Sequence, residues 1–209
     1  MRSFAPHRLG RYECDAWVTY YRHDWARFLP ASVGMVREGF GMPVHRTLQG
    51  AYLVLRANQL WAPYPDNDPA GAERTMRSFY ALVDRVHHIG IDPVEAARRE
   101  VRWWAVHREL QHRPGADEAA AAATAGDAAA AADAVEGADV LTDALADLYS
   151  YVYAVEPEAV RTAAELRARA MVFSDLWVRQ GCDLGSPLLV EELTCLVRSY
   201  GSLLAAVRR

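Results

Sequence analysis

The sequence predicts an all-α protein, a multi-helix bundle of about eight helices with an alanine-rich low-complexity linker. The chain has 209 residues, of which 52% are hydrophobic, so it can bury a substantial core. In one segment after another, apolar residues recur with the period of a helix, and no strand pair or hairpin turn stands out. Proline also recurs where helices would begin. These observations together favour helices packed on helices.

The helix starts are marked by a proline that follows a residue able to cap a helix. Proline suits the first helical position because the N–H that it lacks would have no partner there, and Asp or Ser can accept from the next free N–H groups. Such starts occur at Asp68-Pro69, Asp92-Pro93 and Ser186-Pro187, and with poorer caps at Met42-Pro43 and Glu156-Pro157. The pattern predicts helices near residues 11–28, 31–38, 43–61, 69–88, 93–112, 138–154, 157–180 and 187–207.

Residues 114–137 differ in composition from the rest of the chain. They are rich in alanine, contain three glycines and carry almost nothing to bury. We interpret them as a flexible linker between a five-helix part, residues 1–113, and a three-helix part, residues 138–209. Three amphipathic helices could hardly stand alone, so we expect the second part to pack on the first and form one bundle.

Charge and hydropathy exclude two classes of partner. The formal net charge of -4 argues against a nucleic-acid binder, and no apolar run approaches the ~20 residues that span a bilayer. Residues 39–51 resemble the turn of a helix-turn-helix, but the apolar run that follows is unlike an exposed recognition helix. The N-terminal residues lack the apolar stretch of a secretory signal. We therefore expect a cytoplasmic protein with no nucleic-acid and no membrane partner.

Two further features of the composition exclude several chemistries. All 23 basic residues are arginine, which excludes a lysine Schiff base, pyridoxal phosphate attached through lysine and a P-loop lysine. The cysteines, Cys14, Cys182 and Cys195, are scattered and form no CxxC pair, so a disulfide framework or a cysteine zinc site is not expected. The sequence predicts no cofactor.

The stretch EVRWWAVH, residues 100–107, offers the best candidates for catalysis. On a helix Glu100 and His107 lie about 20° apart around the axis and ~10 Å apart along it, in an arc bounded by Trp103 and Trp104. We expect an acid/base pair in a tryptophan-walled pocket. Alternatively, Glu100 pairs with a buried arginine and His107 caps an indole N–H or a carbonyl. No metal is predicted, because two ligands on one helix normally lie three or four residues apart.

Arginines in apolar surroundings supply candidate ligand-binding residues. Arg56 interrupts an otherwise apolar helix, with Gln59 on its stripe, and Arg167 lies among apolar residues of a later helix. A buried cation requires a carboxylate partner, and Glu13, Asp24 and Glu100 are available. Glu13 and Tyr20 lie along the edge of the core face of the first helix. Such arginines either form structural ion pairs or bind a ligand carboxylate or phosphate.

Three functions stay open at this stage, and the sequence does not decide whether the protein is an enzyme. In the first, Glu13, Arg56, Glu100 and His107 converge on one cavity that binds a small molecule, with acid/base chemistry on an anionic, acyl or aromatic substrate. In the second, these residues pair directly, leave no cavity, and the bundle serves a protein partner or a homo-oligomer. The third is a metal-dependent oxidoreductase in a helical bundle, although the paired ExxH motifs of di-iron bundles are missing.

Overall fold

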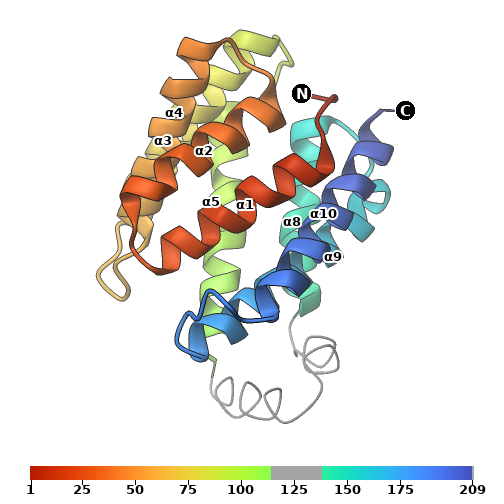
Figure 1. Ribbon diagram of the computed structural model, residues 1–209. Coiled ribbons are helices and arrows are strands. Elements are labelled where there is room, and N and C mark those ends of the chain that lie inside the picture. Colours follow the sequence, from red (N-terminus) through yellow and green to blue (C-terminus); the bar gives the residue numbers. More distant parts are fainter. Residues whose placement is uncertain (114–137, 209) are drawn as a thin grey trace.

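The computed structural model describes residues 1–113 and 138–208, so the predicted linker, residues 114–137, lies outside the described residues. The described chain contains helices and no strand, which confirms the all-α prediction (Figure 1). The helices are α1 (Pro6–Tyr21), α2 (Trp25–Phe40), α3 (Val44–Trp61), α4 (Pro69–His87), α5 (Pro93–Gln111), α8 (Ala138–Tyr153), α9 (Pro157–Arg179) and α10 (Leu188–Val207).

The helices form a closed ring around a central axis. Each helix packs mainly against its neighbours in sequence, and α10 returns to pack on α1. In Figure 1, α2, α3 and α4 lie on one side of α1 and α5, and α8, α9 and α10 lie on the other. One cluster of buried apolar side chains extends through both sides, and a second, smaller cluster lies between α1, α9 and α10. No helix in the described ranges has the length and hydrophobicity needed to cross a membrane.

The helices from α3 onward agree with the predicted ranges to within one residue at each end, but the junction of α1 and α2 does not. The predicted break at residues 29 and 30 is wrong. His23 adopts φ 54°, and the carboxylate of Asp24 accepts from the backbone N–H of Arg27 at 3.1 Å, so the chain turns there and α2 begins at Trp25. Pro30 lies inside α2. The cap formed by Asp24, and not Pro30, therefore marks the start of α2.

The predicted caps at the proline starts are present. The Asp68 carboxylate accepts from the backbone N–H of Gly71 at 2.7 Å, and the Asp92 carboxylate accepts from that of Val94 at 2.8 Å. The Ser186 hydroxyl accepts from the N–H of Leu188 at 3.3 Å. These side chains satisfy N–H groups that the helix itself leaves unpaired.

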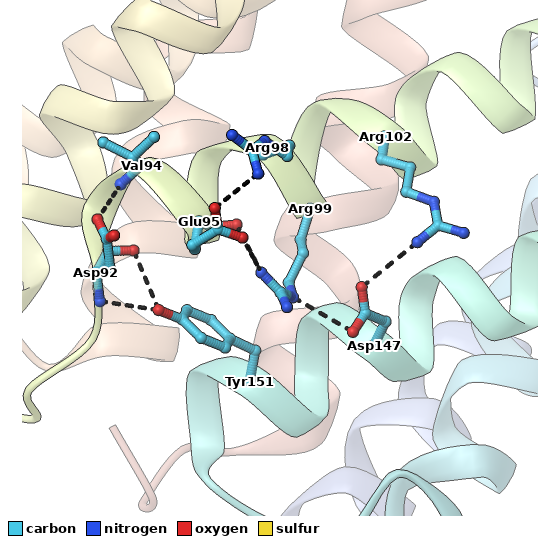
Figure 2. A network of polar contacts seen from close by, with 8 residues as sticks. All are labelled: Asp92, Val94, Glu95, Arg98, Arg99, Arg102, Asp147 and Tyr151. Atoms are coloured by element: carbon cyan, nitrogen blue, oxygen red, sulfur yellow. Dashed lines mark hydrogen bonds and ion pairs between the residues drawn. The ribbon is translucent and has the colours of Figure 1, made fainter.

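A polar network joins α5 to α8 (Figure 2). The Arg99 guanidinium lies between Glu95 of its own helix, at 2.9 Å, and Asp147 of α8, at 3.3 Å, and it stacks over the Tyr151 ring. The Tyr151 hydroxyl accepts from the backbone N–H of Asp92 at 2.9 Å. This network attaches α8 to the N-terminal half of α5, so the opposite face of α5 is held toward the axis of the ring.

Candidate functional site

A cavity of about 210 Å³ lies on the axis of the ring, and each helix of the described ranges contributes to its wall. Most of the wall is apolar and aromatic. The polar side chains are Glu13, Tyr20 and Tyr21 of α1, Asn58 of α3, Tyr80 of α4, Glu100, His107, Arg108 and Gln111 of α5, Tyr149 and Tyr153 of α8, Arg167 of α9 and Tyr200 of α10. Glu13, Tyr20, Glu100, Trp103, Trp104, His107 and Arg167, all predicted from the sequence, thus meet in one place.

Glu100 lies in the wall and is held by three donors. Its Oε1 accepts from the indole N–H groups of Trp103, at 3.1 Å, and Trp104, at 3.2 Å, and its Oε2 accepts from the Tyr80 hydroxyl at 2.6 Å. Burial raises the pKa of the Glu100 carboxyl, while Arg167 and these hydrogen bonds partly oppose the rise. The two tryptophans therefore position Glu100 as well as forming the wall.

His107 lines the cavity and is paired with a carboxylate of α9. Its Nε2 lies 3.1 Å from Oδ2 of Asp175 on α9, and the Gln111 amide donates to Oδ1 of the same carboxylate at 2.6 Å. Gln111 also donates to the Tyr21 hydroxyl at 2.7 Å. Because a carboxylate only accepts, Nε2 carries a proton, and in the neutral imidazole Nδ1 then carries the lone pair. No hydrogen bond to Nδ1 is formed by the described residues.

Asp175 was not among the residues predicted from the sequence. Its position about two turns after Arg167 on the same helix was the available signal. A carboxylate at that point was easily assigned to the surface because aspartate is rarely buried without a partner. The partner, His107, lies 68 residues earlier in the chain.

Arg167 forms a closed ion pair with Glu13. Its Nε lies 3.0 Å from Oε1 of Glu13, and the other carboxylate oxygen accepts from the Tyr200 hydroxyl at 2.5 Å. The guanidinium also donates to the Tyr149 hydroxyl at 3.3 Å and stacks over the Trp103 ring. The charges of the two groups therefore neutralise each other. Of the two roles that the sequence allows for a buried arginine, Arg167 has that of a structural ion pair.

Arg56 and Gln59 are not brought to the cavity. Arg56 is exposed, and its Nη1 donates to the Gln59 side chain at 2.6 Å. Tyr52, on the same stripe of α3, is 57% exposed. The expectation that Arg56 converges with Glu100 and His107 is therefore wrong: this stripe faces outward, and Asn58 and Trp61 face the cavity instead.

Arg108 was missed by the sequence interpretation, although it lines the cavity. Its Nη2 donates to the Tyr20 hydroxyl at 2.9 Å and lies 3.5 Å from the carbonyl oxygen of Trp61, and its guanidinium stacks over the rings of Trp61 and Tyr64. No carboxylate of the described residues forms an ion pair with it. Its place one turn after Trp104 and two turns after Glu100 was the signal that could have revealed it.

A second acid lies deep between α1, α9 and α10. Glu192 is fully buried, and its carboxyl oxygens make no hydrogen bond of good geometry within the described chain. Burial raises its pKa to about 8, and the neighbouring Cys14 and Ser174 oppose the rise only in part. Glu192 does not line the cavity, and we treat it as part of the framework behind α1.

The described residues contain no group of three or more His, Cys, Asp or Glu side chains that could hold a metal ion. The geometry of the described residues therefore gives no support to a metal-dependent oxidoreductase, the third function considered from the sequence. Comparison with known proteins assigns no family: no family model matches the chain, and no curated protein and no solved structure matches it.

Proposed function

We propose that this protein binds a small, largely apolar molecule in the central cavity and carries out acid/base chemistry on it, with His107 as the base. The observation that supports this most is His107, which lies in the wall of a cavity lined by aromatic side chains and is paired with Asp175. A cavity bounded by apolar groups with a few convergent polar ones is typical of small-molecule sites.

The orientation of His107 suits proton transfer. Asp175 accepts from Nε2 and fixes the tautomer, so Nδ1 can take a proton from a bound molecule and later return it. Gln111 and Tyr21 hold Asp175 from its other side, which restricts its movement. Glu100 lies two turns earlier on α5, where its three donors keep it in place as a second polar group for the ligand.

The binding part of the proposal can be tested with a neutral apolar probe. An apolar cavity of about 150 Å³ is large enough for benzene, so toluene is expected to enter and to shift the indole N–H signals of Trp103 and Trp104 in a nitrogen–proton correlation spectrum. Trp177 packs in the second cluster and donates to the Asp183 carbonyl, so its signal is the internal control. Unchanged signals from both cavity indoles would contradict a ligand pocket.

The catalytic part can be tested with p-nitrophenyl acetate, an acyl compound with an aromatic leaving group. The full chain is expected to hydrolyse it faster than buffer, with His107→Asn reducing the excess rate ~100-fold or more, the usual contribution of a general base. His45→Asn is the control because His45 is exposed on α3. Equal rates for the wild type and His107→Asn would exclude His107 as the base.

A further inference from the structure

We infer that the ligand is a monocarboxylate with an apolar body, and that its carboxylate binds Arg108 and Tyr20 at one end of the cavity. This inference rests on the proposed function, since it names the class of molecule that the cavity takes. Its basis is a difference between Arg108 and the other arginines that lie inside or across the bundle.

Two of these arginines are neutralised by carboxylates of the protein. Arg167 pairs with Glu13, and Arg99 lies between Glu95 and Asp147. Arg108 has no such partner among the described residues; its neighbours are a hydroxyl, a backbone carbonyl and two aromatic rings. A partly buried guanidinium that lacks a counter-charge is stabilised by any anion that reaches it.

Arg108 is also held in a fixed orientation. Its plane lies over Trp61 and Tyr64, with the guanidinium carbon 5.5 Å and 5.2 Å from the two ring centres, and Tyr20 accepts one of its hydrogens. The Nε and Nη1 hydrogens form no hydrogen bond with the described residues, and neither does the hydroxyl hydrogen of Tyr20. These hydrogens can donate to the oxygens of an anion that reaches Arg108 and Tyr20.

The charges around the cavity favour a single negative charge on the ligand. Once Glu13 and Arg167 are paired, Arg108 is the one cation of the described lining without a carboxylate partner, and Glu100 contributes a carboxyl of its own. A phosphate with two charges would therefore meet repulsion that one arginine does not offset. The aromatic and apolar walls and the volume of about 210 Å³ suit a ring with a short acidic side chain.

The test uses calorimetry on the full chain with phenylacetate, its neutral analogue phenylacetamide, and phenyl phosphate. We expect phenylacetate to bind at least tenfold more tightly than phenylacetamide. Arg108→Gln should remove this preference without changing the affinity for the amide, and Arg108→Lys, which keeps the charge but not the planar fork, should retain part of it. Arg56→Gln, a change of an exposed arginine outside the cavity, should leave all three affinities as they are.

Each other outcome would overturn the inference. If phenylacetamide binds as tightly as phenylacetate, or if Arg108→Gln and Arg108→Lys both keep the preference, Arg108 serves only to stack on Trp61 and Tyr64. If phenyl phosphate binds most tightly, the monocarboxylate class is wrong. If toluene shifts the indole signals but phenylacetate does not bind, this inference fails and the pocket stands. If neither probe enters, both proposals fail.

Discussion

The Nε2 atom of His107 lies 3.1 Å from Oδ2 of Asp175, so an imidazole of α5 that lines the central cavity is paired with a carboxylate of α9. Both side chains are nearly buried, with 13% and 12% of their surfaces exposed. In such surroundings a hydrogen bond to a charged group is stronger than in water, and it fixes the ring in one orientation.

Asp175→Asn is expected to lower the rate of ester hydrolysis by ~100-fold, because an amide can donate to the ring and no longer imposes one tautomer. The affinity for toluene should stay within twofold, since the walls of the cavity are unchanged. Hydrolysis rates and probe titrations on the same samples measure the two effects. Asp183→Asn, in the exposed turn after α9, is the control. A variant that hydrolyses the ester at the wild-type rate would show that Asp175 does not position His107.

Glu192 should make the stability of the protein depend on pH. Its pKa in the folded chain is about 8, against an ordinary value of 4.5, so between these values the folded state holds a proton that the unfolded state has lost. The free energy of unfolding should therefore fall as pH rises from about 4.5 to about 8, and then level off.

Glu192→Gln should remove the part of this fall that Glu192 contributes and raise the melting temperature at pH 8 relative to the wild type, because the amide carries no charge at any pH. Melting curves from pH 5 to pH 9 check it. Glu191→Gln, a change of the exposed neighbour on α10, should keep the wild-type dependence. Parallel curves for Glu192→Gln and the wild type would show that Glu192 titrates near its ordinary pKa.

Glu13→Gln should destabilise the protein by about 3 kcal/mol or more, because it leaves the Arg167 guanidinium buried without its counter-charge. The double variant Glu13→Gln with Arg167→Met should recover part of that loss, since a buried pair can often be replaced by apolar groups. Urea denaturation measures both free energies. If the double variant loses as much free energy of unfolding as Glu13→Gln alone and Arg167→Met alone added together, the pair is not coupled.

Trp103→Phe should raise the pKa of the Glu100 carboxyl further, because it removes an N–H that donates to Oε1 and leaves burial in place. Carbon-13 titration of labelled glutamate side chains can follow this group. Trp17→Phe is the matched control: Trp17 also lines the cavity, and its indole makes no hydrogen bond to Glu100. An unchanged titration of Glu100 in Trp103→Phe would exclude the indole as a determinant of its charge.

Much of the fold could be predicted because helix signals are local. Asp68 and Asp92 cap their helices from three and two residues away, within the same stretch of sequence that predicts them. The break between α1 and α2 was misplaced because two local signals competed: Pro30 was taken as the break, whereas Asp24 caps α2 and Pro30 lies inside that helix.

The candidate site was predicted in part. The helical arc placed Glu100 and His107 between two tryptophans, and both lie in the cavity wall. The inward face of α3 was harder to predict because that helix is apolar nearly all round. Arg56 was therefore assigned to the inside, although its stripe faces solvent. A helix with one clear apolar face reveals its orientation, and a helix without one does not.

The helices, most of their bounds and the side chains of α5 that share a face could be predicted from the amino-acid order, since these depend on period and capping within one segment. The pairing of charged groups instead follows from how distant helices pack. Asp175 meets His107 and Glu13 meets Arg167 from segments 68 and 154 residues apart, and Arg108 receives no carboxylate from the described residues. These partners depend on the way eight helices close into a ring, because a charge far away in the sequence becomes a neighbour only when packing brings its helix to the axis.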